Sequence, residues 1–379
     1  MNSIETFIAL NRFGLGARTD EIALVERSPR SWFERQIDPR TPVPAVLSRF
    51  PGSAEILKDY YAARLSGSRE LRKEIRKRQQ RGFIEETVAR ARYMVVSETP
   101  FAERMVLFWS NHFTVSRTKA NIGPAIPAYE REAIRPHLFG RFEDMLLAVV
   151  GHPVMLSYLD NSVSVGPRSK AGRRRGRSLN ENLAREVLEL HTLGVNGGYT
   201  QSDVTEFAKA LTGWTHGGMV GKKQRHKVHG RFVFRNIIHE PGAKTVMGKT
   251  YRQNGVKEAQ AILRDLVHHP ATARFIATKL VRHFVADEPP LAAVRAVADT
   301  FRRTGGDLAA VSRSLYTLNA LWREPLPKVK TPYELVISTY RALGISDLKA
   351  RHLRSPLTSM GQEPFRAPSP QGWPEQASH

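Results

Sequence analysis

The chain has 379 residues, of which 41% are hydrophobic and 25% are charged, and these shares are typical of a globular protein. Its 58 lysines and arginines against 36 acidic residues give a formal charge of +22, which attracts polyanions. The absence of cysteine excludes disulfides, thiolate catalysis and Cys-ligated metal sites. The first residues do not predict an export signal, because they contain Glu5 and no sustained apolar run. No tract reaches the roughly 18 apolar residues of a membrane span. We therefore expect a soluble protein, cytoplasmic by default, although a periplasmic protein would also fit.

Helical periodicity dominates the first half of the chain. Within residues 100–113, Met105, Phe108, Trp109 and His112 follow one another at helical spacing, so His112 is predicted to face the core. A second buried face is predicted for the helix that follows residue 200, formed by Val204, Phe207, Ala208, Leu211 and Trp214.

The stretch between these two helices carries helix end signals. Ser178 with Glu181 is predicted to form a capping box, and Gly194 is predicted to end that helix in the left-handed conformation. Thr200 and Asp203 repeat the start signal for the next helix, so two antiparallel helices are expected here.

Residues 228–253 break the helical pattern with β-branched and aromatic residues around a Pro-Gly pair, which predicts a small β-hairpin. Helical pairs resume at about residue 256. The fold class is therefore predicted to be mainly α, a multi-helix single domain built from helical hairpins with one small β-hairpin. We expect this domain to span residues 1–355, followed by an extended, proline-rich tail at 356–379.

Several segments, taken together, resemble a bacterial family catalogued as domain of unknown function 1800. They are RFGLGA (12–17), FWSNHF (108–113), NENLAREVLELHTLGVNGGYTQSDV (180–204), ALTGWT (210–215), HEPGAKTVMG (239–248), HPATARFIATKLVRHFVAD (269–287) and GWP (372–374). The resemblance covers nearly the whole chain but implies no activity. Relatives usually continue for several helices beyond GWP, so we expect a C-terminally short member, and they tend to have Asp where this chain has Glu240.

The polar residues among these segments suggest a catalytic site. Glu186 lies on the edge of an apolar helix stripe and His112 on an apolar face, so both are candidate catalytic residues. His112, His191, His239 and Glu240 form a set of nitrogen and oxygen ligands suited to Zn, Fe or Mn. If they converge, a bound divalent metal would activate water, which makes a metal-dependent hydrolase the leading hypothesis.

Each of these residues also has a purely structural interpretation. A buried glutamate can pair with an arginine, and core histidines can bond to carbonyl groups. Glu189 is predicted to pair with Arg185 one helical turn away, and Lys244 to pair with Glu240.

Two other classes of function stay open. The basic tracts 69–81 and 168–177 would allow the protein to bind a polyanion or nucleic acid. Alternatively, the chain is a scaffold without chemistry, whose tail at 356–379 docks on a partner protein.

Overall fold

Helices form almost all of the regular structure, as predicted. The computed structural model describes residues 3–119, 122–175, 178–217, 230–323 and 328–376. In the first half of the chain the α-helices are α1 (Ser3–Ile8), α2 (Thr19–Arg27), α3 (Pro29–Glu34), α4 (Ala45–Ser48), α5 (Ser53–Leu65), α6 (Arg69–Val96), α7 (Pro100–His112), α8 (Ile126–Tyr129), α9 (Phe142–Val150), α10 (Pro153–Tyr158), α11 (Gly172–Arg175), α12 (Asn182–Glu186) and α13 (Gln201–Leu211).

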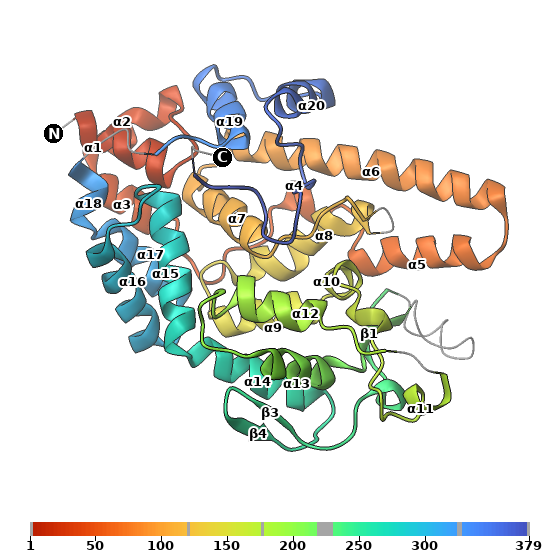
Figure 1. Cartoon of the computed structure of the whole chain (residues 1–379). Coiled ribbons are helices and arrows are strands. Elements are labelled where there is room, and N and C mark those ends of the chain that lie inside the picture. Colours follow the sequence, from red (N-terminus) through yellow and green to blue (C-terminus); the bar gives the residue numbers. More distant parts are fainter. Residues whose placement is uncertain (1–2, 120–121, 176–177, 218–229, 324–327, 377–379) are drawn as a thin grey trace.

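Longer helices follow in the second half. They are α14 (Val256–His268), α15 (Pro270–Phe284), α16 (Leu291–Thr304), α17 (Leu308–Tyr316), α18 (Asn319–Arg323), α19 (Pro332–Ala342) and α20 (Ala350–Ser359). Three π-helical turns, η1 (Ala9–Phe13), η3 (Glu130–Ile134) and η6 (Val187–His191), continue neighbouring helices. Successive helices pack as hairpins, notably α5 with α6, α12 with α13 and α15 with α16, and the α5–α6 pair projects from one side of the molecule (Figure 1).

The local end signals gave one wrong prediction and two that are confirmed. Gly194 is left-handed, with φ of +81°, and Thr200 forms a reciprocal capping box with Asp203. The predicted capping box of Ser178 is wrong, because the helix begins only at Asn182, whose amide is bound by the side chain of Asn180.

The strands differ in part from the prediction. A hairpin does lie within 228–253, but β3 (Lys244–Val246) and β4 (Lys249–Tyr251) form it around Met247 and Gly248, not around the Pro-Gly pair. Both turn residues have positive φ, which matches the twist of a two-residue hairpin loop. The other strand of the segment, β2 (Phe232–Phe234), pairs with β1 (Trp214–His216). Trp214 had been predicted to continue the buried face of the preceding helix, so this part of the prediction is wrong.

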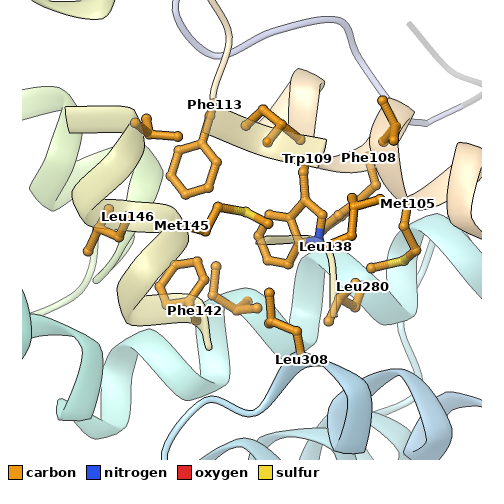
Figure 2. Close-up of a cluster of buried hydrophobic side chains, with 14 of the residues drawn as sticks. Met105, Phe108, Trp109, Phe113, Leu138, Phe142, Met145, Leu146, Leu280 and Leu308 are labelled. Carbon is orange, nitrogen blue, oxygen red and sulfur yellow. The ribbon is translucent and has the colours of Figure 1, made fainter. Parts of the chain in front are cut away.

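Helix α7 occupies the centre of the hydrophobic core. Trp109 is fully buried and its ring lies 5.8 Å from that of Phe113 and 5.6 Å from that of Phe142. Figure 2 shows the side chains of α7 directed toward α9, with Leu280 of α15 and Leu308 of α17 closing the cluster. The predicted apolar stripe of α7, including His112, is confirmed. Truncating Trp109 to alanine would cost about 3–5 kcal/mol.

Arg341 of α19 connects segments that are distant in the sequence by binding their main-chain oxygens. Its guanidinium, 1% exposed, donates to the carbonyl oxygens of Gly16, Met94, Val95 and Ser97. It also binds the carboxylate of Glu21 at 2.8 Å. One side chain thus fixes the N-terminal segment and the end of α6 against α19, and close packing at Gly16 leaves no room for a side chain beside Ser338.

The tail and the basic tracts also have defined positions. Residues 356–359 belong to α20, so they are helical where an extended chain was predicted, and residues 360–376 run without regular structure along the rest of the protein. Tract 69–81 is the first part of α6, and tract 168–177, described to residue 175, contains α11. Among the described helices, none combines the length and apolar character needed to cross a bilayer.

Candidate functional site

His112 and His191, two of the predicted ligands, are brought together by the end of α7 and the π-helical turn η6. Their ring centroids are 6.0 Å apart, and both side chains are buried. His112 Nε2 lies 3.1 Å from the carbonyl oxygen of His191. Within the part of the chain that the structure describes, His112 Nδ1 and both ring nitrogens of His191 have no hydrogen-bond partner.

The electrostatic surroundings of this pair oppose positive charge. Burial, reinforced by the charge of Lys279, lowers the pKa of His191 to about 3 and that of His112 well below its usual range. Both rings are therefore neutral at pH 7, but a divalent cation placed between them would meet the same repulsion from Lys279.

The other two predicted ligands have other partners. His239 Nδ1 lies 2.7 Å from the carbonyl oxygen of Thr212, and its Nε2 lies 3.2 Å from Glu258. Glu240 is 1% exposed and binds Arg168 of the basic tract 168–177 at 2.7 Å. The predicted ion pair of Lys244 with Glu240 is wrong, because the ammonium group binds the carboxylate of Glu258 at 2.8 Å and only the main-chain oxygen of Glu240.

Glu186, the predicted catalytic carboxylate, is half-buried at the end of α12. Burial and the neighbouring charge of Glu189 raise its pKa. The predicted pair of Glu189 with Arg185 is present at 3.6 Å. Across the described residues, no three His, Asp or Glu side chains are grouped so that they could hold a metal ion, so the five predicted residues do not form a common ligand set.

A different cavity, of about 100 Å³, gathers buried groups that the sequence analysis did not select. It lies between α7, α15, the start of α19 and residues 362–375. Its lining includes one histidine and two glutamates whose side chains are at most 8% exposed, namely His283, Glu334 and Glu375. They come from three separate segments of the chain.

The geometry places the imidazole of His283 between the two carboxylates. Its Nδ1 lies 3.8 Å from Glu375 Oε2, and its Nε2 lies 3.7 Å from Glu334 Oε1. Both separations exceed hydrogen-bond length. Among the described residues, His283 Nε2 and Glu375 Oε2 are buried without a hydrogen-bond partner, whereas Glu334 Oε1 is paired with Arg104. Because the two ring nitrogens face different carboxylates, the three groups cannot chelate one ion.

Burial lowers the pKa of His283 to about 4, although the charges of Glu375 and Glu334 oppose that effect. For Glu334, burial favours the neutral acid, but Arg104 and His283 outweigh it and lower its pKa. Arg104 Nη2 lies 3.2 Å from Glu334 Oε1. At pH 7 the cavity thus holds a neutral imidazole beside an ionised Glu334.

The Tyr333 hydroxyl is a further hydrogen-bonding group that lines the same cavity. The Tyr333 hydroxyl is buried and its proton has no acceptor. Its ring lies under the guanidinium of Arg90, which is held by Glu130 at 2.7 Å. Burial raises the pKa of Tyr333, so the hydroxyl keeps its proton at neutral pH.

One wall of the cavity is the segment around Trp373. Asn111 of α7 fixes it by donating to the Trp373 carbonyl oxygen at 2.9 Å and accepting from the Trp373 amide at 2.7 Å. Gly372 has φ of +88°, and a β-carbon there would lie 2.5 Å from Asn111 Oδ1, so this approach requires glycine. Glu375 owes its position to this contact.

A second cavity, of about 380 Å³, lies on the other side of the same wall. Both cavities are lined by Asn111, Trp373 and Glu375, and the second adds the cationic side chains of Lys279 and Arg282. Burial lowers the pKa of Lys279, and Glu375 opposes that shift. Glu375 thus stands between an acid–base cavity and a cationic one.

Comparison with known proteins supports the resemblance seen in the sequence. Residues 8–379 match the family described as "Protein of unknown function (DUF1800)". The chain belongs to this family. No curated protein and no solved structure matches it.

In this DUF1800 protein the sequence analysis missed His283, Glu334 and Glu375. One signal was available for His283, since Ile276 and Leu280 precede it at helical spacing and place it on the buried face of α15. The segments that carry the resemblance also converge at the cavity, with Asn111 in FWSNHF, His283 in HFVAD and Trp373 in GWP. No local pattern marks Glu334, which doubles as the third residue of a helix capping box.

Another pair in the DUF1800 chain resembles a nucleophile with its base. Ser157 Oγ lies 2.9 Å from His216 Nε2, and both residues are buried. However, the Ser157 hydroxyl donates its proton to the carbonyl oxygen of Pro153 at 2.8 Å, so His216 must donate to Ser157 and cannot accept its proton. This pair is therefore structural.

Proposed function

We propose that this DUF1800 protein is a hydrolase whose active site is the cavity around His283, with His283 as general base and then general acid. One observation carries the proposal: among the described residues, His283 Nε2 and Glu375 Oε2 are buried without hydrogen-bond partners in a single cavity, which the Tyr333 hydroxyl also lines. Because native proteins satisfy nearly all buried polar groups, unpartnered groups gathered in one cavity support the binding of a polar molecule there.

The first step follows from the protonation states. A neutral His283 takes a proton from a water molecule in the cavity, and the hydroxide formed attacks the substrate carbonyl carbon. The resulting imidazolium is stabilised by Glu375 and Glu334, which face its two nitrogens. When the carbon–leaving group bond breaks, the leaving oxygen or nitrogen takes the proton back from His283.

The Tyr333 hydroxyl supplies a donor for the negative charge that develops on the carbonyl oxygen. Its proton has no acceptor in the described structure, so donation to the substrate costs no existing bond. A cavity of about 100 Å³ admits only a small group, such as an ester or amide. The neighbouring cationic cavity, with Lys279 and Arg282, suits an anionic end of the same substrate.

The test uses 4-nitrophenyl acetate and 4-nitrophenyl hemisuccinate, which present an ester without and with a carboxylate. The wild type should hydrolyse both and prefer the hemisuccinate, and His283→Gln should lower kcat/KM by about 10²–10⁴-fold. His268→Gln, which changes an exposed histidine, is the matched control and should leave kcat/KM unchanged. Equal rates for the wild type and His283→Gln would contradict the proposal.

The metal-dependent hydrolase predicted from Glu186 and His112 has weaker support. Only His112 and His191 are brought together, no carboxylate joins them among the described residues, and Lys279 repels cations there. Elemental analysis for Zn, Fe and Mn, with His112→Ala and Glu186→Ala beside the wild type, decides between the two mechanisms. Stoichiometric metal that is lost in both folded variants would favour the metal site.

A further inference from the structure

A groove of about 730 Å³ between α5 and α6 has a strongly one-sided charge. Among the described residues that line it, every charged side chain is an arginine, namely Arg64, Arg72, Arg76 and Arg117. Arg64, Arg72 and Arg76 are exposed and line the groove. Arg64 belongs to α5 and the other two belong to α6, the two helices that project together (Figure 1). Like charges gathered without a carboxylate repel one another unless an anion joins them.

Arg117 is the least solvated of the four. It is half-buried, and its guanidinium lies over the ring of Phe83, 4.7 Å from the centroid. No acid within the described chain forms an ion pair with it. Burial lowers its pKa, and Arg366 and Arg354 push it in the same direction against Glu363. An anion bound here would relieve an unfavourable concentration of positive charge.

The basic lining continues beyond this groove. A second groove, of about 280 Å³, also contains Gln80, Phe83 and Arg117, and it adds Arg354 and Arg366. The only acid that lines this second groove is Glu363, which is already bound to Arg366 at 2.8 Å. Arg117 therefore stands at the junction of two grooves that form one track across α6.

The arginines of α6 are spaced and held for repeated contacts. Arg72 and Arg76 are one helical turn apart, about 6 Å along the axis. Arg72 is positioned by bonds to the carbonyl oxygens of Ser68 and Gly67 at 3.1 and 3.2 Å. Guanidinium groups bind phosphate oxygens through two parallel N–H bonds, and a side chain fixed beforehand loses less entropy on binding.

We propose that this track, lined by Arg64, Arg72, Arg76 and Arg117, binds a single-stranded nucleic acid through its phosphates. Two joined open grooves fit a chain of phosphates better than a single ion. Gln79 and Gln80, which also line the track, carry amide donors and acceptors that suit sugar and base edges. The inference is independent of the His283 cavity.

The second basic tract of the sequence does not share these properties. Arg168 is neutralised by Glu240, and the amide of Ala171 donates to the carbonyl oxygen of Ile237. Arg168 thus differs from the groove arginines, because its charge is already matched by a carboxylate.

The test measures fluorescence anisotropy of a labelled single-stranded 15-residue oligonucleotide with the full chain at several salt concentrations. Arg72→Gln with Arg76→Gln removes two groove charges. The control, Lys73→Gln with Lys77→Gln, removes two charges at the same spacing on the same helix, from exposed residues that do not line the groove. Near 0.1 M salt the groove variant should bind roughly 25-fold more weakly, with a salt slope shallower by about 1.4, as expected for two lost phosphate contacts.

Three results would overturn the proposal. The first is no binding of the oligonucleotide by the wild type. The second is an equal loss of affinity in the groove variant and the control, which would indicate net charge alone. The third is groove-dependent binding of heparin or of anionic lipid vesicles that exceeds binding of the oligonucleotide, which would assign the track to another anion. Arg117→Gln, alone, should weaken oligonucleotide binding about 5-fold near 0.1 M salt, consistent with one contact.

Discussion

Two regions of this protein bury histidines without completing their hydrogen bonds, and they differ in what surrounds the rings. His283 faces a carboxylate at each ring nitrogen and lines a cavity. His112 and His191 are packed among aromatic rings, and Lys279 is the charge that acts on them. Burial lowers the pKa in both regions, to about 4 for His283 and about 3 for His191. Only the first region can stabilise the protonated ring, so a low pKa by itself does not mark a catalytic histidine.

The largest expected effect tests the carboxylate side of this comparison. Glu334→Gln keeps the side-chain shape but leaves Arg104, 2% exposed, without its ion-pair partner. Removing one member of a buried pair costs about 3–5 kcal/mol, which urea unfolding would measure. Glu189→Gln breaks the half-exposed pair with Arg185 and should cost under about 1 kcal/mol. Similar decreases in the free energy of unfolding of both variants would contradict the prediction that the buried Glu334–Arg104 pair contributes more to stability.

A second prediction concerns the wall that holds Glu375 near His283. Gly372→Ala introduces a β-carbon 2.5 Å from Asn111 Oδ1, so residues 372–375 must move. Gly361→Ala is the matched control, because Gly361 also has positive φ, +77°, but has open space around it. We expect Gly372→Ala to cost about 1–3 kcal/mol more than the control and to lower ester hydrolysis. An unchanged rate of ester hydrolysis in Gly372→Ala would show that the position of Glu375 does not matter for the reaction.

The pH dependence of stability sharpens the comparison further. The unfolded chain protonates His191 near pH 6.5, whereas in the folded protein this pKa is about 3. Between these values the unfolded state binds the extra proton, so the free energy of unfolding falls as pH falls below 6.5. Between pH 6 and 5, the free energy of unfolding should fall less steeply in His191→Leu than in the wild type, by about 1.4 kcal/mol per pH unit. Urea unfolding at each pH measures this dependence, and the same slope in His191→Leu and the wild type would contradict the prediction.

The smallest effect is expected at neutral pH in the same pair. His191→Leu removes two buried nitrogens that have no partner, while His112 keeps its bond to the main-chain oxygen of residue 191. Because unsatisfied polar groups are destabilising, we expect a change within about 1 kcal/mol, in the stabilising direction, and unchanged hydrolysis. A large decrease in the hydrolysis rate of this variant would indicate that the active site is at His112 and His191 instead.

The features that sequence predicted correctly are those set by nearby residues. The α7 stripe and the Thr200 cap depend on spacings of three and four residues, which the chain fixes locally. The pairing of β1 with β2 was missed because Trp214 continues the helical pattern of α13, and tertiary pairing overrides it.

The candidate site was harder to predict because, within its own segment of sequence, each of its residues has an ordinary structural role. Glu334 is a helix-capping residue, His283 is a position on an apolar stripe, and Glu375 lies in an irregular segment. Only the packing of α7, α15 and α19 brings them together. The predicted ligands His239 and Glu240 failed to join the others for the same reason, since their partners Glu258 and Arg168 carry no sequence signal.

The contacts of Arg341 constrain the order of assembly during synthesis. The carbonyl groups of residues 16, 94, 95 and 97 acquire the guanidinium of Arg341 as a donor only when a residue more than 200 positions later has emerged from the ribosome. Until then these carbonyl oxygens lack the donor that Arg341 provides. Contacts of such long sequence separation also slow folding. Nascent chains halted before residue 341 should therefore be captured by chaperones or degraded at their N-terminal end.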